Sequence, residues 1–270
     1  MENMPISFIG GGVMAESLIK GILNSGVSKP QDIIVSEPLK ERCSYLESEY
    51  GIRTVNENRD LIDYGGLLLL SVKPQTLPKI YSELSGAIKP DRSVVSIAAG
   101  VTSDNICRGL SHTSIIRVMP NTPAQIGEGI SVWTASDEVP ASDKILVENM
   151  LNTLGENYYV EDEKLVDMAT ALSASGPAYV FLFLESLIEA GVYLGMSRTM
   201  ARTLAIKTIQ GSVELVKSSG KHPAELKDMV TSPGGTTIEA LVSLENDGFR
   251  PAVINGVRAA FERSREMGIE

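Results

Sequence analysis

The chain has few cysteines and histidines, and this scarcity excludes two classes of protein. Two cysteines, Cys43 and Cys107, are too few for a disulfide framework. Together with the two histidines, His112 and His222, they form no spacing typical of metal ligands. We therefore expect neither a disulfide-rich protein nor a metal site.

Basic residues are also in deficit. The chain carries 24 Lys and Arg residues against 34 Asp and Glu residues, which gives a net charge of −10 and a sequence pI near 4.9. Sequence-independent binding of nucleic acid needs a basic face that neutralises phosphates. The charge balance therefore argues against a nucleic-acid partner, although it leaves room for local basic pockets.

The sequence gives no sign of a targeting segment or a membrane span. Residues 1–4 are not basic, and Glu16 and Lys20 interrupt the apolar stretch that follows, unlike a signal or transit peptide. The densest apolar run, residues 66–72, is far too short to cross a bilayer. With 270 residues, 43% hydrophobic and 21% charged, we expect a soluble cytoplasmic protein of one or two domains with no membrane partner.

The first 163 residues alternate short β-branched, apolar runs with helical patterns. Strands are predicted at residues 6–9, 32–36, 52–55, 67–72, 94–98, 115–119, 130–134 and 158–160. Helices are predicted at residues 15–24, 40–49, 76–84, 103–110 and 141–154. Several strands are apolar throughout, which is typical of a sheet covered on both faces. This half therefore predicts an α/β fold with a mainly parallel, doubly wound sheet.

Residues 164–270 show only helical patterns. Helices are predicted at residues 165–172, 179–194, 200–216, 225–230, 238–244 and 251–267, with Ser197 as an N-cap and Pro223 in a first helical turn. The segment 181–184, Phe-Leu-Phe-Leu, is apolar on all sides and predicts a helix that is packed on most of its surface. A monomeric helical core and a dimerisation domain both satisfy this requirement, and we favour dimerisation.

A glycine-rich loop follows the first predicted strand. The strand at residues 6–9 leads into Gly10, Gly12 and Ala15 in a G-x-G-x-x-A pattern, and the helix around residues 16–23 follows. Gly10 allows a tight turn, Gly12 lets backbone approach a pyrophosphate, and Ala15 permits close packing of helix and strand. The helix N-terminus adds unpaired N–H donors, so the loop predicts dinucleotide binding.

The end of the second strand leaves the choice of nicotinamide cofactor open. If Glu37 takes the acidic position beside the adenosine ribose, NAD is favoured. If Ser36 faces the ribose with Lys40 or Arg42 nearby, the 2′-phosphate of NADP is accommodated.

Two further loops follow the fourth and fifth predicted strands, residues 71–74 and 97–100, where an open α/β sheet forms its ligand crevice. Lys73 can serve the cofactor or substrate site, or it can be a solvated lysine. Asn121, between two prolines after the sixth strand, can bind a ligand or hold its turn.

The helical half contains one unusual loop, residues 231–237, with the sequence Thr-Ser-Pro-Gly-Gly-Thr-Thr before an apolar helix. Backbone N–H groups and hydroxyls at such a helix start can hold a carboxylate without a basic side chain. An ordinary capped loop is the alternative. The small residues of the segment 173–179 predict either a kink or a close approach.

Several segments match one family in order along nearly the whole chain. They are IGGGVMA at 9–15, SVKP at 71–74, VVSIAAG at 94–100, MPNTPA at 119–124, SGPAYVF at 175–181 and ELKDMVTSPGGTTIEAL at 225–241. Together they resemble pyrroline-5-carboxylate reductase. The resemblance implies reduction of 1-pyrroline-5-carboxylate to L-proline by NADPH or NADH, the last step of proline synthesis. It also implies an N-terminal Rossmann domain and an all-α C-terminal dimerisation domain, with dimers often assembled into larger rings.

The resemblance also assigns functional residues. Its cofactor contacts, with Glu37 added from the reading of the second strand, are Ile9, Gly10, Gly11, Gly12, Val13, Met14, Ser36, Glu37, Asn58, Ser71, Val72, Lys73, Pro74, Ile97, Ala98 and Ala99. Its substrate contacts are Ser175, Ser232, Gly234, Gly235, Thr236 and Thr237. In the family dimer, one subunit's Rossmann domain meets its partner's helical loop. Some members have a small or hydroxyl side chain where Glu37 stands, so the acid argues against a strict NADP preference.

The reaction that the resemblance implies needs a hydride donor positioned over one face of the imine carbon. It also needs a protonated imine nitrogen and a substrate carboxylate that is held in place. The sequence offers no nucleophilic triad or carboxylate pair, and a protonated imine needs none. We assign a hydrogen bond near the imine nitrogen to Thr237. His222 is a general-acid candidate by residue type alone, and its place before Pro223 favours a role at the start of a helix.

Three other functions fit parts of the pattern. A β-hydroxyacid dehydrogenase needs a lysine on the helix between its domains, and residues 174–194 contain none. A deazaflavin-dependent NADP reductase shares the glycine loop but should not have the 232–237 loop. A nucleotide sensor without catalysis would not need the two substrate segments. A six-membered cyclic imine also stays possible as substrate, because one methylene contributes only about 1–3 kcal/mol of discrimination.

Overall fold

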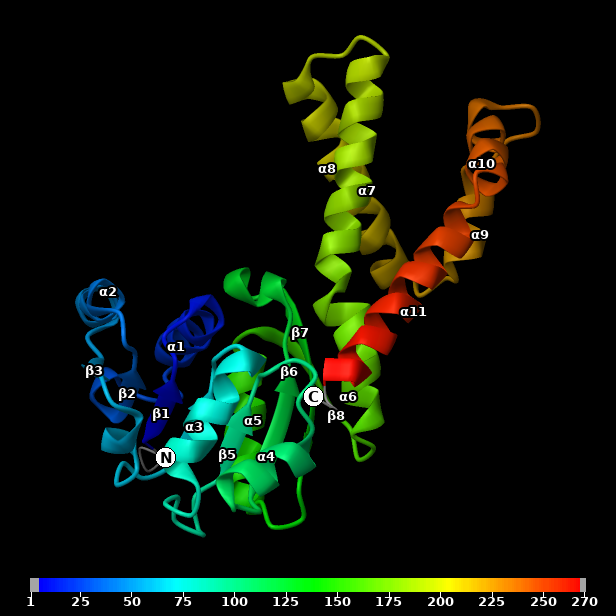
Figure 1. Cartoon of the computed structure of the whole chain (residues 1–270). Coiled ribbons are helices and arrows are strands. Elements are labelled where there is room, and N and C mark those ends of the chain that lie inside the picture. The colour runs from blue at the N-terminus through cyan, green and yellow to red at the C-terminus, as the bar shows by residue number, and fades with distance from the viewer. Residues whose placement is uncertain (1–4, 268–270) are drawn as a thin grey trace. The chain divides into compact units, whose positions relative to one another are not determined.

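The computed structural model of the chain describes residues 5–267, which form two compact units (Figure 1). One unit comprises the chain up to Ser175 together with the C-terminal residues from Ala260, and the other comprises residues 176–259. The predicted domain boundary between residues 163 and 164 is a different division, and it stays a prediction. Residues 1–4 and 268–270 of the predicted domains lie outside the described residues.

The first unit contains one eight-stranded sheet with the strand order β3-β2-β1-β4-β5-β6-β7-β8. Neighbouring strands are parallel except for β6 and β7, which are antiparallel. The strands are β1 (Ile6–Ile9), β2 (Ile33–Ser36), β3 (Arg53–Val55), β4 (Leu67–Leu70), β5 (Val94–Ser96), β6 (Ile115–Met119), β7 (Gly129–Ala135) and β8 (Gly155–Tyr159). The mainly parallel, doubly wound sheet is confirmed, and every predicted strand is present.

Helices cover both faces of this sheet, which explains why its central strands are apolar throughout. Along β4, Leu67 and Leu69 belong to a core with α1, α2 and α5, whereas Leu68 and Leu70 belong to a core with α3 and α4. Alternate residues of a strand point to opposite faces, so both sets of leucines are buried. The α-helices of this unit before Ser175 are α1 (Val13–Ser25), α2 (Lys40–Tyr50), α3 (Leu77–Leu84), α4 (Ser103–Leu110), α5 (Ala141–Asn152) and α6 (Lys164–Ala169).

The second unit is entirely helical, which confirms the all-α prediction for this part of the chain. Its helices are α7 (Gly176–Tyr193), α8 (Arg198–Ser219), α9 (Pro223–Met229), α10 (Thr236–Asn246) and the first part of α11 (Phe249–Met267). Helices α7 and α8 form a close hairpin, because a Cβ on Gly191 would lie 2.7 Å from the Cβ of Ala201. The predicted N-cap is also present, since the Ser197 hydroxyl accepts a hydrogen bond from the Met200 N–H.

The predicted helix at residues 165–172 differs in its second half. Helix α6 ends at Ala169, and the five residues Thr170–Ala174 form a π-helical turn closed by a hydrogen bond from the Ser175 N–H to the Thr170 carbonyl. The predicted kink at the small residues 173–179 is therefore a wide turn just before α7. Such turns occur often at functional sites.

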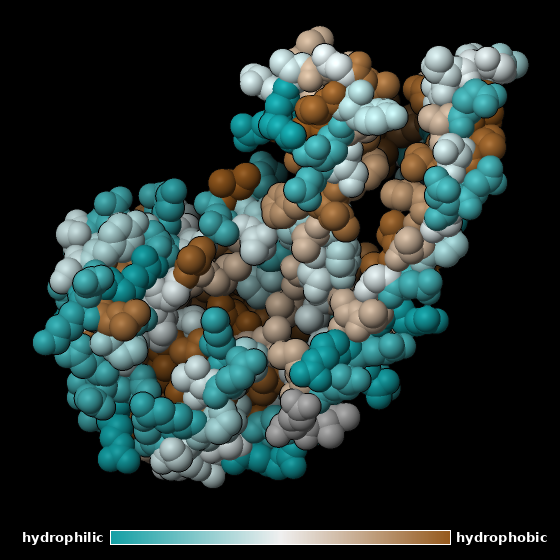
Figure 2. Space-filling model, turned by 45° about the horizontal axis from the view of Figure 1, so that its top comes forward, coloured by the Kyte–Doolittle hydropathy of each residue, from teal (hydrophilic) through white to brown (hydrophobic). Residues whose placement is uncertain are grey.

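The second unit has almost no core of its own. Among its described residues only Ala201 and Ala205 are buried, and α7 buries none. Figure 2 shows hydrophobic side chains, coloured brown, on the helices of this unit. The exposed large ones include Phe181, Leu182, Tyr193, Leu194, Val213, Met229, Val230, Val242 and Ile254. Apolar surface of this extent is typical of an interface rather than of a free surface.

One helical stretch, Lys164–Tyr193, is also long and apolar enough to cross a membrane by length and composition alone. Its most apolar window has a mean hydropathy of 1.4 and is 6% buried. The prediction of no membrane span rested on the run at residues 66–72 and did not consider this longer stretch.

Candidate active site

The hydrogen-bond register of the sheet brings four loops to one edge. Ile9 pairs with both Ser36 and Leu70, and Leu70 pairs with Ser96. The residues that directly follow β1, β2, β4 and β5 therefore leave adjacent strands at the same level. Strand order reverses between β1 and β4, and an open α/β sheet binds its ligand at such a point.

The glycine loop follows β1 as predicted, and each of its glycines meets a different requirement. Gly10 has φ +95°, and a Cβ there would lie 2.8 Å from the Ser71 carbonyl oxygen. A Cβ on Gly11 would lie 2.7 Å from Cδ1 of Leu46, whereas a Cβ on Gly12 would meet nothing within 4 Å. The first two glycines thus permit close packing, and the third leaves open space in front of the loop.

Helix α1 begins directly behind that open space. Gly12 is its N-cap, and no side chain caps the helix. The N–H groups of the first turn and the helix dipole therefore face the open side of the loop, an arrangement that favours an anion such as a pyrophosphate.

Glu37, the first residue after β2, holds the glycine loop through a hydrogen bond to its backbone. Its Oε2 accepts a hydrogen bond of 2.9 Å from the Gly11 N–H, and its Oε1 accepts one of 3.0 Å from the Leu39 N–H. The side chain is 8% exposed. Glu37 is therefore fixed at the end of the second strand, and the choice between Glu37 and Ser36 as the residue beside the ribose stays a prediction.

Arg42 braces the same loop from α2. Its Nε donates a hydrogen bond of 2.6 Å to the Gly11 carbonyl, and its Nη2 forms an ion pair of 2.5 Å with Glu16. The hydroxyls of Tyr45 and Tyr50 also donate to Glu16. Partial burial alone would raise the pKa of the Glu16 carboxyl, but the hydrogen bonds from Arg42, Tyr50 and Tyr45 hold it below its ordinary value.

Ser36, the residue before Glu37, begins a separate chain of polar contacts that passes through Asn58. The Ser36 hydroxyl donates a hydrogen bond of 2.8 Å to Oδ1 of Asn58, and Nδ2 of Asn58 donates one of 2.6 Å to Oε2 of Glu83. Both residues were predicted as cofactor contacts, and the structure brings them to the end of β2 and the beginning of the 3₁₀ turn Asn58–Leu61.

The loops after β4 and β5 complete the edge. The Ser71 hydroxyl donates to the carbonyls of Ile9 and Gly10 at 3.0 and 2.8 Å, which ties the two loops together. The Ile97 N–H donates to the Leu70 carbonyl, and Ala98 and Ala99 add only methyl groups. Lys73 lies at the start of the next 3₁₀ turn with its side chain exposed, and its role stays a prediction.

Asn121 holds backbone on both sides of its loop. Its Oδ1 accepts a hydrogen bond from the Ile130 N–H at 3.0 Å, and its Nδ2 donates one to the Ser173 carbonyl at 3.2 Å. Of the two predicted roles, the structure supports the one in which Asn121 holds the turn. Through Ser173 it also fixes the π-helical turn, where the hydroxyl of Ser175 donates to the Thr170 carbonyl.

The loop at residues 232–237 lies in the second unit. Gly234 has φ +64°, and a Cβ on Gly235 would overlap the Ser232 hydroxyl, so both glycines are required by the turn. Helix α10 begins at Thr236 with Gly235 as its N-cap and no capping side chain. Thr236 and Thr237 are therefore the first two residues of the helix and do not cap it, so its first-turn N–H groups have no side-chain cap.

His222 has the structural role that its place in the sequence favoured. It is the N-cap of α9, and its Nδ1 accepts a hydrogen bond of 3.2 Å from the Ala224 N–H.

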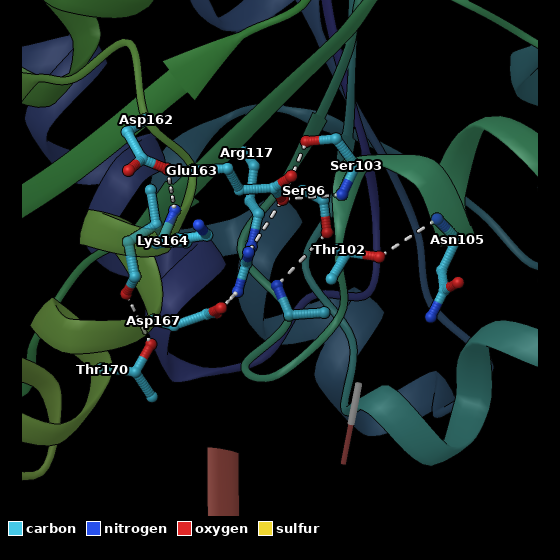
Figure 3. Close-up of polar contacts among 12 residues, drawn as sticks. Ser96, Thr102, Ser103, Asn105, Arg117, Asp162, Glu163, Lys164, Asp167 and Thr170 are labelled. Atoms are coloured by element: carbon cyan, nitrogen blue, oxygen red, sulfur yellow. Dashed lines mark hydrogen bonds and ion pairs between the residues drawn. The ribbon is translucent and has the colours of Figure 1, made fainter. Parts of the chain in front are cut away.

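A buried ion-pair cluster around Arg117 was missed by the sequence analysis (Figure 3). Arg117 on β6 is 1% exposed and contacts Glu163 at 2.8 Å and Asp167 at 2.6 Å. Glu163 also accepts hydrogen bonds from the N–H and hydroxyl of Ser103 at the start of α4. The cluster joins β6, α4 and α6, and α6 leads into the turn that carries Ser175. A single arginine inside the apolar strand Ile115–Met119 was its signal in the sequence.

The fold and the edge site define a class: a doubly wound sheet with an uncapped glycine loop at its switch point is typical of nicotinamide-dependent oxidoreductases. Comparison with protein families agrees. A model described as NADP oxidoreductase, coenzyme F420-dependent, matches residues 5–100, and one described as pyrroline-5-carboxylate reductase dimerisation matches residues 163–267.

Full-length relatives specify the family. The chain is 41% identical to the pyrroline-5-carboxylate reductase of Synechocystis over 98% of this chain and 99% of that protein. It is 38% identical to the Escherichia coli enzyme of that name over 97% of both. It is also similar to the crystal structure of Plasmodium falciparum pyrroline carboxylate reductase with NADP bound, with 36% identity, a TM-score of 0.87 and 99% of both chains covered. The chain therefore belongs to the pyrroline-5-carboxylate reductase family.

We predict that Arg117→Met lowers the free energy of unfolding by about 2–4 kcal/mol, because it leaves two partly buried carboxylates without their cation. Equilibrium urea unfolding measures the change. Adding Glu163→Gln and Asp167→Asn to the variant should restore part of the loss. The exposed Arg108→Met serves as control, and an Arg117→Met protein as stable as the control would contradict this account.

We also predict that Glu16→Gln lowers the free energy of unfolding by about 1 kcal/mol at neutral pH. The folded-state pKa of Glu16 lies below its unfolded value. Its stabilisation is therefore present above the unfolded pKa and is lost as the pH falls through the folded one. Urea unfolding across this pH range should show the variant and the wild type converging in acid. A gap that persists in acid, or an equal gap for the exposed Glu57→Gln, would disprove the assignment.

Proposed function

We propose that this chain catalyses the NAD(P)H-dependent reduction of 1-pyrroline-5-carboxylate to L-proline, the last step of proline biosynthesis. The observation that carries the proposal is the full-length similarity to enzymes of that name. A sensor without catalysis and a β-hydroxyacid dehydrogenase account less well for the match of the C-terminal residues 163–267. The deazaflavin-dependent reductases are matched only over the N-terminal residues 5–100.

The predicted cofactor residues fit a dinucleotide. The uncapped start of α1 behind Gly12 would hold the pyrophosphate, and the small side chains of Ser71, Ala98 and Ala99 would let the rest of the molecule lie against backbone. The bound cofactor supplies the hydride. The proposal also includes the remaining predicted cofactor contacts. These are Ile9, Gly10, Gly11, Val13, Met14, Ser36, Glu37, Asn58, Val72, Lys73, Pro74 and Ile97.

The protein's part in the reaction is binding and orientation. The backbone N–H groups at the start of α10, with Ser232, Gly234, Gly235 and Thr236, would hold the substrate carboxylate. The Thr237 hydroxyl would accept a hydrogen bond from the protonated imine nitrogen, whose proton comes from solution. The C=N bond becomes a C–N single bond when the hydride reaches the ring carbon, so no further acid is required. Ser175 would line the same site.

The substrate loop and the cofactor loop lie in different units, so we propose that a second copy of the chain completes the site. The match to a dimerisation family model makes the protein a homo-oligomer. We infer a dimer whose helical units cover each other's apolar helices, with domains divided between residues 163 and 164 and dimers able to assemble into a larger ring. In this proposal a partner subunit, and not lipid, covers the stretch Lys164–Tyr193. The free Cys43 and Cys107 are consistent with a cytoplasmic location.

The Thr237 assignment predicts a specific kinetic defect. Thr237→Ala should lower kcat/KM for pyrroline-5-carboxylate roughly 10-fold to 100-fold, the loss expected for one hydrogen bond to a charged group. Binding of the reduced nicotinamide should be unchanged in a direct titration. The control is Thr203→Ala, which removes an exposed hydroxyl from α8. Unchanged steady-state kinetics in Thr237→Ala would refute the role.

The dimer assignment predicts that Leu182→Glu, which places a charge on the exposed face of α7, shifts the protein toward monomer by at least roughly tenfold in dissociation constant. Sedimentation velocity over a dilution series measures the change, with the exposed Ser218→Glu on α8 as control. A wild-type protein that is monomeric, or that floats with lipid vesicles, would overturn the proposed interface.

A further inference from the structure

The carboxylate of Glu37 is fixed in place. One oxygen accepts the Gly11 N–H and the other accepts the Leu39 N–H, and the backbone N–H of Glu37 itself donates to the Val55 carbonyl. The group thus lies between the glycine loop, the start of α2 and β3. A carboxylate has about four acceptor positions, so two are left for a ligand at the end of β2.

The cation that contacts the same glycine loop, Arg42, has other partners. Arg42 donates to the Gly11 carbonyl and pairs with Glu16, and this pairing offsets its charge. A second carboxylate is linked to Ser36 through Asn58, which accepts the hydrogen bond from the Ser36 hydroxyl and donates one to Glu83. The residue that precedes Glu37 is therefore also connected to an acid. Lys40 and Arg59 are exposed cations on neighbouring elements, at the starts of α2 and of the following 3₁₀ turn.

We propose that Glu37 makes this site selective for NADH over NADPH. The proposal rests on the proposed function, since it concerns the adenosine end of the same cofactor site. In NADH, the 2′- and 3′-hydroxyls of the adenosine ribose can donate hydrogen bonds to a fixed carboxylate. The 2′-phosphate of NADPH brings two negative charges toward it and cannot donate in the same way.

The test is direct binding of each reduced nicotinamide to the full-length protein, followed by the fluorescence of the nicotinamide ring. Wild type should bind NADH roughly tenfold or more tightly than NADPH. Glu37→Gln keeps the size of the side chain and one acceptor oxygen but removes the charge, so NADPH should bind more tightly and the ratio of the two dissociation constants should fall. Glu37→Ser should bring the ratio to one or reverse it, because the fixed charge at the end of β2 is then gone while the exposed cations Lys40 and Arg59 remain on the neighbouring elements.

The matched control is Glu41→Gln, which removes the same charge from an exposed position on the first turn of α2. Its ratio should equal that of wild type. If the ratio of the two dissociation constants falls equally in Glu41→Gln, the selectivity comes from the overall charge and not from a contact with Glu37, and the proposal is overturned. High salt should also narrow the wild-type ratio, because mobile ions screen repulsion between partly exposed charges.

The other outcomes are decisive too. A wild type that binds NADPH as tightly as NADH, or a ratio unchanged in Glu37→Gln, disproves the role of Glu37 and leaves the reductase function intact. A wild type that binds neither nucleotide contradicts the cofactor site itself and therefore the proposed function. If Glu37→Ser fails to fold, the ratio in Glu37→Gln decides.

Discussion

The site depends on the register of four parallel strands. Because Ile9 is level with Ser36 and Leu70, and Leu70 with Ser96, the glycine loop, Glu37 and the loops that begin at Ser71 and Ile97 emerge together. Burial on both faces of the sheet fixes that register, since a shift by one residue would turn the leucines of β4 to the opposite cores. This end of the sheet is therefore formed mostly by backbone and small side chains, and the charged groups Glu37 and Arg42 hold the glycine loop through hydrogen bonds to Gly11.

The helical unit, residues 176–259, differs from the first unit because it has almost no buried core of its own. Its helices are regular, and α8 and α9 have N-capping side chains, yet they bury almost nothing within their own unit. Such a unit is stable only when another surface covers it, and the dimerisation family match indicates a second copy of the chain. The same requirement explains how a long apolar helix can occur in an enzyme with a net charge of −10. The loop at residues 232–237 lies in this unit, whereas the glycine loop lies in the other.

Much of this could be predicted from the sequence. Short apolar, β-branched runs between helical patterns predicted all eight strands, and the capping residues Ser197 and His222 are where local chemistry puts them. The Arg117 cluster could not be predicted, because Arg117 is 46 residues from Glu163 and 50 from Asp167 and only the tertiary fold brings them together. The role of Asn121 was ambiguous for the same reason, since its partner Ser173 is 52 residues away. The π-helical turn was also missed, because helical periodicity alone does not distinguish it from an α-helical turn.

The most direct test of the account uses reduced nicotinamide carrying deuterium at the transferable position, incubated with the protein and 1-pyrroline-5-carboxylate. The account predicts oxidation of the nicotinamide with one equivalent of L-proline formed, carrying the deuterium on the ring carbon that was double-bonded to nitrogen. Nicotinamide binding without oxidation, or oxidation that leaves no deuterium in proline, would contradict it.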